Sequence, residues 1–512
     1  MNINIKNIKK IIAVILLALL VISVSVSCSA GGGDNKNDGD ADNFGDSTEN
    51  QDEAKQTTER IYPDLKEQDF GGYEFRILAR TTSQIDWDKW KHRDIYAEQE
   101  NGDPINDAIY KRTGEIYDTY GIKLKQINSD DIVNDLSKSV RAGTDDYQGL
   151  WCWQSQIAQL STRNALVNLY DVPNLDVSNE WWDQKSIEAF SMGDKLYFVT
   201  GELSINAKHD TNAVLFNKKI FNDLAIEYPY KMVYENKWTL DNYISLSKQF
   251  SKDLDGDGVR TSKDAYGFIG QWANLYTYMV GCGITAVGKD ENNYPVLSLY
   301  SERAVNVFDK ISEVMYDDTI MINPVQSKVL DEYGGDSIGV WTASREEWFA
   351  GNRLLFYMAG IGCVEELRNM ESPFGVLPMP KYDENQKEYH SETSQFCTAV
   401  GIAATNGNLE AAGYTLEAMS ALSCNELKAA YYDNLLRRKI LRDDESEGML
   451  DVIFSARSYD ISMVYDIGGF MGMFVELGNK KSKDFTSAYE KKEAAAVKQL
   501  DKLIETYKTM GE

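Results

Sequence analysis

The chain has 512 residues, of which 43% are hydrophobic, and 80 Asp and Glu outweigh 53 Lys and Arg to give a formal charge of -27. A chain of this length and hydrophobic content is expected to form a globular body of two or more domains and is too apolar for a disordered protein. The acidic balance opposes binding to nucleic acid or to an anionic membrane surface, because like charges repel. The charge balance is compatible with cationic ligands and with neutral ligands such as sugars.

Residues 1–27 have the pattern of a secretory signal. The segment "MNINIKNIKK" carries lysines, "IIAVILLALLVISVSV" is apolar, and small residues then lead to Cys28. The small residues favour a lipoprotein signal that is cleaved before Cys28, whose sulfur then carries a lipid, although Ser25 stands where such signals usually have Leu. A transmembrane anchor is the alternative, since the apolar stretch approaches the length that spans a bilayer. Residues 28–61 are acidic and rich in Gly, Ser and Asn, which predicts a flexible tether to a body outside the cytoplasm.

Strands and helices are expected to alternate in the first part of the body. Apolar and polar residues alternate in "GGYEFRILAR" (71–80) and "IKLKQI" (122–127), which predicts two strands, and "YQGLWCW" (147–153) is an apolar segment that follows the next helix. Amphipathic helices are expected over 103–121, where Asp-Pro is a natural start, and over 131–143. This alternation predicts an α/β body with largely parallel sheets.

The remaining segments continue in the same style. We predict strands at "GDKLYFVTGEL" (193–203), at the start of "TNAVLFNKKIFNDLAI" (211–226), at "RLLFYMAG" (353–360), at "FGVLPMP" (374–380) and at "CTAVGIAAT" (397–405). We predict helices over 237–254, 408–423 and 482–510, the last of them long and charged.

The stretch "DLDGDGVRTSKD" has the spacing of a calcium loop. Acidic residues occupy positions one, three, five and twelve of the window, and Gly258 occupies position six, where the sharp turn falls. The predicted oxygen ligands are those of Asp253, Asp255, Asp257, Val259 (backbone carbonyl), Thr261 and Asp264. Asp264 replaces the usual Glu, and Arg260 replaces an aliphatic residue. The alternative is a solvated Asx-rich turn. Because "AYGFIG" after the loop predicts a strand and not a helix, we expect calcium as a structural brace and not as a sensor.

The other chemistry-bearing residues are too scattered for a catalytic or metal centre. The three histidines, His92, His209 and His390, are far apart, which disfavours a zinc site or a histidine-based triad. The five cysteines beyond Cys28 are isolated and odd in number, so they do not form a disulfide scaffold. No phosphate-binding or nucleophile-elbow motif is present in the sequence.

The order of several segments resembles a known family. "LYFVTGE", "NAVLFNKKIFNDL", "KWTLDNY", "EEWFAGNRLLFYMAGIG", "FGVLPMPKYD" and "TAVGIAATNGNLEAAGYTLEAMS" follow the predicted lipoprotein cysteine and tether in the order seen in extracellular solute-binding proteins of sugar ABC transporters, of the maltose-binding-protein type. The resemblance covers nearly all of residues 62–512. Each motif alone is weak, and their order carries the specificity.

The resemblance implies a two-lobed periplasmic-binding-protein-like fold of type II. Each lobe would be a mostly parallel sheet flanked by helices, and a hinge crossed near residues 206, 394 and 430 would join them. Lobe one would comprise 62–205 plus 395–430, and lobe two 206–394 plus 431–512. A ligand that touches both lobes would stabilise the closed form and so signal occupancy to a permease.

A sugar site needs flat aromatic faces for the rings and carboxylates or amides for the hydroxyls. The resemblance places such residues at the cleft, and the ligand-binding candidates are Trp151, Trp153, Gln154, Glu202, Asp210, Trp272 and Tyr276. The alternative for each aromatic residue is a place in the core. Trp181 and Trp182 are expected to be structural.

The implied function is that of a lipid-anchored, monomeric binding component of an ABC importer, without enzymatic activity and without nucleic-acid partners. It would capture a carbohydrate and deliver it to membrane permease subunits. The length of 62–512 favours an oligosaccharide over a monosaccharide, and peptides or polyamines stay open. Two rivals are an extracellular glycoside hydrolase, for which no diagnostic carboxylate pair stands out, and a non-catalytic carbohydrate-binding adhesin.

Overall fold

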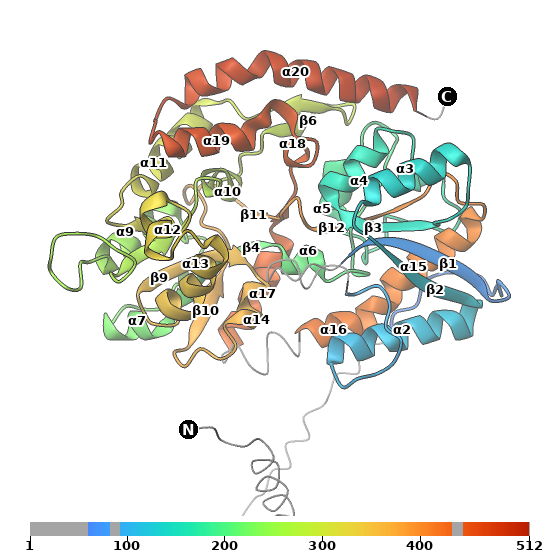
Figure 1. Ribbon diagram of the computed structural model, residues 1–512, viewed down its shortest axis with the longest axis horizontal. Coiled ribbons are helices and arrows are strands. Elements are labelled where there is room, and N and C mark those ends of the chain that lie inside the picture. Colours follow the sequence, from blue (N-terminus) through green and yellow to red (C-terminus); the bar gives the residue numbers. More distant parts are fainter. Residues whose placement is uncertain (1–59, 82–92, 433–443, 511–512) are drawn as a thin grey trace, which may run out of the picture. The chain divides into compact units, whose positions relative to one another are not determined.

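The computed structural model describes residues 60–81, 93–432 and 444–510, which belong to one compact unit (Figure 1). The predicted signal, Cys28 and all but the last residues of the predicted tether lie outside the described residues. None of the described helices is long and apolar enough to cross a membrane.

The first sheet has four strands in the order β12-β3-β1-β2. Their bounds are β1 Tyr73–Arg80, β2 Ile122–Ser129, β3 Gly149–Trp153 and β12 Thr398–Ile402. β1 runs parallel to β2 and to β3, whereas β12 joins β3 in antiparallel register, with Thr398 opposite Trp153. The sheet is therefore mostly parallel, as predicted, and a strand from late in the chain closes one edge.

Helices cover both faces of this sheet. Figure 1 shows α2, α15 and α16 below it and α3 and α4 above it. Their bounds are α2 Pro104–Tyr120, α3 Ile132–Ala142, α4 Gln154–Ser161, α15 Leu409–Asn425 and α16 Leu427–Tyr431, and a short α5 covers Gln184–Phe190. We call this sheet and these helices lobe one.

Local sequence explains where α2 begins and ends. The side chain of Asp103 accepts a hydrogen bond from the Asn106 amide at 2.9 Å, and Pro104 occupies the first turn, where its missing N–H costs nothing. Gly121 then ends the helix in the left-handed region, with φ at 62°. The predicted helix over 103–121 is confirmed.

The second sheet has five strands in the order β10-β4-β9-β5-β8. Their bounds are β4 Asn212–Asn217, β5 Tyr266–Ile269, β8 Met321–Ile322, β9 Leu354–Gly360 and β10 Phe374–Leu377. β5 is parallel to β8 and β9, and β4 is antiparallel to β9 and β10. Every side chain of β5 and of β10 is buried, which suits strands that are covered on both faces.

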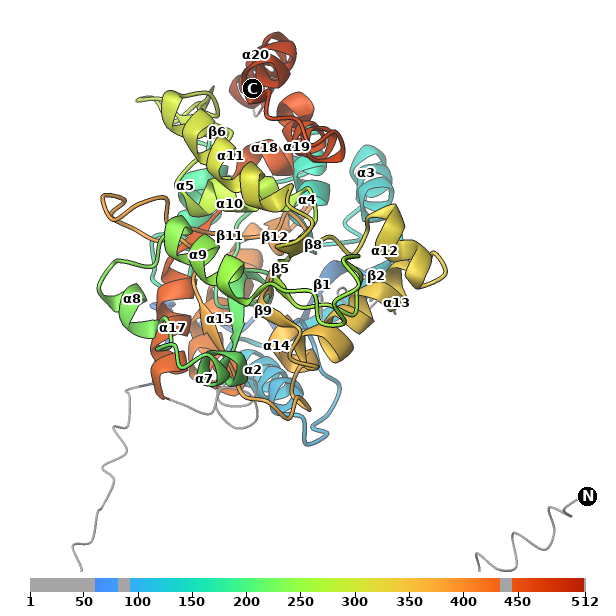
Figure 2. The ribbon, with the colours of Figure 1, turned by 90° about the vertical axis from the view of Figure 1, so that its left-hand side faces the viewer.

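Most of the remaining helices pack around the second sheet, and we call this sheet and these helices lobe two. They are α7 Lys218–Asp223, α8 Tyr230–Tyr234, α9 Leu240–Phe250, α10 Asn274–Gly281, α11 Glu302–Met315, α12 Ser327–Glu332, α13 Ser337–Ala343, α14 Cys363–Glu366, α17 Asp444–Ser455, α18 Ile461–Val464, α19 Phe470–Asn479 and α20 Phe485–Thr509. A small hairpin, β6 Val287–Lys289 with β7 Pro295–Leu297, also belongs to it. Figure 2 shows α19 and α20 side by side at one end.

Short elements lie where the chain passes between the sheets. They are α6 Asn206–His209, β11 Ser391–Glu392 and β13 Arg457–Ser458, and β11 pairs with β13. The strands of the two sheets fall on either side of the predicted crossings near 206 and 394. The third crossing, near 430, is followed by residues 433–443, which lie outside the described residues. The lobe bounds themselves stay a prediction.

One predicted strand is wrong. Residues 193–203 form no strand and make only isolated bridges, such as Val199 with Val400 of β12. The Val199 amide donates to Val400 at 3.1 Å, and the Val400 amide donates back at 2.9 Å. The apolar run that suggested a strand is buried because Leu196 and Phe198 pack into the core beside β12. Burial therefore explains the pattern without a continuous ladder.

Lobe two forms hydrogen bonds with the loop around Gly193 and Lys195 of lobe one. Asn293, in the β6–β7 hairpin, donates from its side chain to the Gly193 carbonyl at 3.1 Å and accepts from the Gly193 amide at 3.2 Å. The Lys195 ammonium donates to the carbonyl of Tyr507 at 2.8 Å and to that of Met510, at the end of α20. Gly193 has a positive φ of 60°, and a Cβ there would lie 2.7 Å from the Tyr294 hydroxyl, so a larger residue would be strained at this position.

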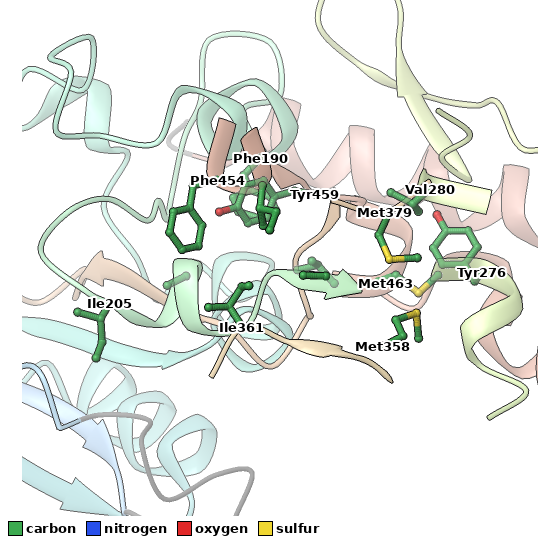
Figure 3. Close-up of a cluster of buried hydrophobic side chains, with 14 of the residues drawn as sticks. Phe190, Ile205, Tyr276, Val280, Met358, Ile361, Met379, Phe454, Tyr459 and Met463 are labelled. Carbon is green, nitrogen blue, oxygen red and sulfur yellow. The ribbon is translucent and has the colours of Figure 1, made fainter. Parts of the chain in front are cut away.

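A buried apolar cluster continues through the region between the sheets. Figure 3 shows Phe190 of α5 beside Tyr459, and Val280 beside Met463 and Tyr276. The rings of Phe190 and Tyr459 are 5.3 Å apart in an edge-on arrangement. Hydrophobic packing therefore joins lobe one to the segment after β13.

Candidate functional site

An aromatic platform lies where β3 ends and β12 begins. The antiparallel register places Trp153 next to the residues that precede Thr398. The rings of Trp153 and Phe396 are 5.0 Å apart and meet edge to face, and the Arg80 guanidinium lies 3.5 Å from the centre of the Trp153 ring. Phe396 is 36% exposed, so part of this platform is open to solvent. Flat apolar faces beside a hydrogen-bond donor suit a sugar ring.

Sequence reasoning named Trp153 but missed its two neighbours. Arg80 is the last residue of β1, and parallel strands bring the ends of β1 and β3 to the same edge of the sheet. Phe396 directly precedes the predicted strand at 397–405. The signal that could have found both is their position at strand ends beside the predicted cleft.

Asp210 lies at the meeting point of two connecting segments. Its carboxylate is 3.3 Å from His209 Nδ1, and its backbone carbonyl accepts from the Ser394 amide at 3.2 Å. The Gly362 amide donates to the His209 carbonyl at 2.9 Å, and a Cβ at Gly362 would overlap the His209 ring at 2.0 Å. Asp210 therefore lies where the segments around residues 210, 362 and 394 meet, and its role as a ligand contact at the hinge stays a prediction.

Trp151 and Gln154 flank the platform but are buried. Trp151, 1% exposed, lies between Ala79 of β1 and Val400 of β12 in the middle of the first sheet. The Gln154 amide donates to the Cys397 carbonyl at 3.0 Å, which ties α4 to the start of β12. In this arrangement Trp151 offers the ligand no exposed ring face. Both remain predicted ligand contacts.

Glu202 belongs to an ion pair at the hinge. Its carboxylate is 2.5 Å from the Lys208 ammonium, in a cavity of about 30 Å³ that Arg457 also lines. Burial raises the pKa of Glu202, but the charges of Lys208 and Lys428 outweigh it and leave the pKa below its ordinary value. Glu202 is thus a carboxylate with a cation already beside it, and its binding of a sugar hydroxyl stays a prediction.

Trp272 and Tyr276 pack inside lobe two. The Trp272 ring lies against Gly478 of α19, where a Cβ would come within 2.5 Å of it, and 5.9 Å from the Tyr316 ring. Tyr276 is fully buried, and its hydroxyl donates to Asp460. The structure does not bring either ring to the platform at Trp153. Their role in ligand contact stays a prediction.

The predicted calcium loop gathers three of its carboxylates. Asp253, Asp255 and Asp257 offer oxygen atoms that lie within 4.8 Å of one another. Asp264 is buried and accepts from the amides of Leu254 at 3.0 Å and Thr261 at 2.8 Å. Asp264 therefore closes the loop on itself.

Backbone donors also shape this loop. The amides of Gly258 and Gly256 donate to Asp253 at 2.8 and 2.7 Å, and these bonds hold the pKa of Asp253 below its ordinary value. Both glycines have φ near 80°, at 81° and 77°, which only glycine adopts readily. The Val259 amide donates to Asp257 at 2.6 Å. A loop whose carboxylate oxygens are gathered in this way suits a cation, and calcium stays a prediction.

Comparison with known proteins gives matches at the level of structure. No protein-family model and no curated protein sequence matches the chain. An extracellular solute-binding protein from Staphylococcus aureus in complex with maltose has 12% identity, covering 84% of this chain and 98% of its own, with a TM-score of 0.55. A cyclo/maltodextrin-binding protein complexed with maltotetraose has 14% identity, covering 86% and 98%, with a TM-score of 0.53. The apo form of RafE from Streptococcus pneumoniae has 15% identity, covering 84% and 98%, with a TM-score of 0.52.

At these identities the likeness establishes the fold and not the ligand. The matches extend over nearly the full length of the solved chains, and they agree with the two mixed, parallel-rich sheets described above. The predicted fold class is confirmed: the chain has the two-lobed α/β fold of extracellular solute-binding proteins.

Proposed function

We propose that this protein is the substrate-binding component of an ABC importer that captures a carbohydrate between its two lobes and delivers it to permease subunits in the membrane. The two-lobed fold supports this function, because a ligand that touches both lobes stabilises one arrangement of the hinge. Solved proteins of the same fold hold maltose and maltotetraose. An oligosaccharide is the proposed ligand class, and the protein acts without catalysis.

The platform of Trp153, Phe396 and Arg80 is the observation that carries the choice of a sugar. Aromatic faces bind the apolar side of a pyranose ring, and a guanidinium donates to ring hydroxyls. Asp210, at the hinge, supplies an acceptor near the second lobe. A peptide or polyamine would need paired backbone donors or a cluster of carboxylates instead, and neither is part of this platform.

The decisive experiment is a ligand screen on the body that begins at residue 60. Maltose, maltotetraose, other oligosaccharides, a peptide mixture and a polyamine are tested for a rise in melting temperature, since a ligand that binds only the native state stabilises it. The positive ligand is then titrated by calorimetry. Stabilisation by a peptide or by the polyamine alone would refute the carbohydrate assignment, and turnover of a glycoside would favour the hydrolase.

Two variants connect the binding to the platform. Trp153→Ala and Phe396→Ala should each weaken the binding of the positive sugar by about 1–3 kcal/mol, from lost ring stacking and apolar burial. The matched control is Tyr110→Ala, which removes an exposed ring from the outer face of α2 and should leave affinity unchanged. Equal affinity in all three variants would place the sugar elsewhere.

We further propose that the body lies outside the cytoplasm on a lipid attached to Cys28, as the signal pattern indicates. Calcium in the loop at Asp253 to Asp264 is proposed as a structural brace of lobe two. It would neutralise the gathered carboxylates of Asp253, Asp255 and Asp257. Both proposals rest on sequence spacing, and the loop arrangement supports the second one.

A further inference from the structure

A small polar cavity lies between the lobes, and residues that neighbour the aromatic platform in the chain line part of it. It has a volume of about 10 Å³, enough for one water-sized group. Lobe one contributes Gln154 and Gln395, which are the chain neighbours of Trp153 and Phe396. Glu392, at the end of β11, and Val280 of α10 in lobe two also line it. Separation of the lobes therefore opens this cavity.

The cavity contains polar groups whose hydrogen bonds are not made. Gln154 Nε2 and Thr393 Oγ1 have no hydrogen-bond partner among the described residues, although the two residues are only 1% and 4% exposed. Leaving a buried polar group unpaired is unfavourable, because the group loses its hydrogen bonds to water without gaining others. Two such groups therefore line the same cavity as the Glu392 carboxylate.

Two carboxylates line this cavity. Asp460 also lines the cavity and is buried, and it accepts from the Tyr276 hydroxyl, the Ala286 amide and the Ser462 amide. Glu392 has weaker partners: the Asn212 side chain lies 3.5 Å away, and Thr277 donates to it from α10. In the described part of the chain, no ion pair joins a basic side chain to either acid.

The basic and titratable groups on the surrounding elements are occupied elsewhere or neutral. On β13, Arg457 is paired with Asp183 at 2.7 Å. Before β4, His209 lies 3.3 Å from Asp210. On the chain before β11, burial lowers the pKa of His390, whose ring is 3.3 Å from a serine hydroxyl. The α4 side contributes only the neutral Gln154, and α10 contributes Thr277 and the neutral phenol of Tyr276.

Apolar walls complete the environment of Glu392. Val280 and Met463 line the cavity, and Figure 3 shows both of them near Tyr276. Burial is the largest influence on Glu392 and raises its pKa to about 7, and the charge of Asp460 acts in the same direction. The neutral carboxylic acid is thus favoured in the arrangement that the structure shows.

We propose that Glu392 takes up a proton when the lobes come together over this cavity, so that ligand capture is coupled to proton binding. This inference rests on the proposed function, because it assigns a regulation to the same hinge. With the lobes apart, water reaches Glu392 and the carboxylate ionises. With the lobes together, Gln154 and Gln395 lie beside it in the cavity, and the reduced access of water favours the neutral acid.

The sign of the pH dependence follows from linkage. Glu392 has a raised pKa in the lobes-together arrangement, so the stability of that arrangement is fully present below the ordinary value of 4.5 and is lost as pH rises through about 7. Ligand affinity should therefore fall about tenfold between pH 6 and pH 8. Binding should take up about 0.9 proton per ligand at pH 6 and about 0.5 at pH 7.

The test is calorimetric titration of the sugar identified by the screen, at pH 6 and pH 7, in buffers of different ionisation enthalpy. The slope of binding enthalpy against buffer enthalpy gives the number of protons taken up. The wild-type protein should show uptake, and Glu392→Gln, which keeps the shape without the proton, should show none. A slope of zero for the wild type, or a wild-type slope in Glu392→Gln, overturns the proposal.

A matched control separates this site from other acids. Glu417 lies in α15 of lobe one, and burial also raises its pKa to about 7, but its donors are Trp182, Asn179 and Asp176 of the same lobe. Glu417→Gln should keep the wild-type proton uptake. Loss of uptake in Glu417→Gln would show that the protons belong to lobe one and not to the cavity.

The proton switch can also be measured without a ligand, from the size of the protein as a function of pH. The radius of gyration from X-ray scattering is recorded from pH 5 to pH 9 for the wild type and for Glu392→Gln. The wild type should expand as pH passes about 7, and the variant should not. A radius independent of pH in the wild type refutes the proton switch, whereas binding of no carbohydrate refutes the proposed function alone.

Discussion

Glu417 offers a direct test of the electrostatics inside lobe one. It is 2% exposed and accepts from Asn179 Nδ2 at 2.6 Å, from Trp182 Nε1 at 3.0 Å and from the Asp176 amide at 3.4 Å. Burial outweighs these donors and raises the pKa of Glu417 from 4.5 to about 7. The substitution Glu417→Gln keeps the shape and removes the ionisation.

The expected effect grows with pH. Because the native pKa is raised, the contribution of Glu417 to stability is present below pH 4.5 and is lost as pH rises through about 7. A shift of 2.5 units, from 4.5 to about 7, corresponds to about 3 kcal/mol when the group is fully ionised. The free energy of unfolding of Glu417→Gln, relative to wild type, should therefore rise by about 2–3 kcal/mol between pH 5 and pH 8.

Denaturant unfolding of both proteins at pH 5, 6, 7 and 8 measures this difference. Subtraction at each pH cancels the titration of all other groups that the substitution does not touch. Glu188→Gln is the control, because its side chain is 73% exposed and its replacement should change stability little at any pH. A difference between Glu417→Gln and wild type that is the same at every pH would falsify the assignment of a buried, destabilised carboxylate.

Three further outcomes are expected. Chelation of calcium should lower the melting temperature of the body, and added calcium should restore it. The double variant Asp255→Ala/Asp257→Ala should melt like the chelated protein. Equal melting curves with chelator and with calcium would exclude the ion. Gly193→Ala should destabilise the protein by about 1–3 kcal/mol, because residue 193 has a positive φ and the new Cβ would lie 2.7 Å from the Tyr294 hydroxyl. An unchanged melting temperature would show that the contact between residue 193 and the β6–β7 hairpin does not contribute to stability. Cys28→Ala should abolish labelling by a radioactive fatty acid in the host, and an unlabelled wild type would remove the lipid anchor from the proposal.

Local sequence was sufficient for the main elements of the fold. Asp103-Pro104 and Gly121 mark the ends of α2 because capping and backbone preference act within a few residues. Alternating residues predict β1 and β2, since side chains point to opposite faces along a strand. The alternation of strands and helices predicted an α/β body with largely parallel sheets, because it leaves few ways to build a sheet, whereas the two lobes were implied by the resemblance to sugar-binding proteins.

Tertiary packing decided the rest. The apolar segment 193–203 is buried without a ladder, because burial and strand pairing produce the same pattern of apolar residues. The ion pair of Glu202 with Lys208 is close in sequence, yet its burial in the hinge depends on how the lobes meet.

The candidate site depends most on the tertiary structure. Arg80, Trp153 and Phe396 come from three separate segments, and only the register of the first sheet places them together. The environment of Glu392 is likewise set by Asp460 and by residues of the other lobe. A sequence determines which side chains are present and their local conformational preferences. Contacts between distant segments, and the desolvation that shifts a pKa, arise only when the chain folds.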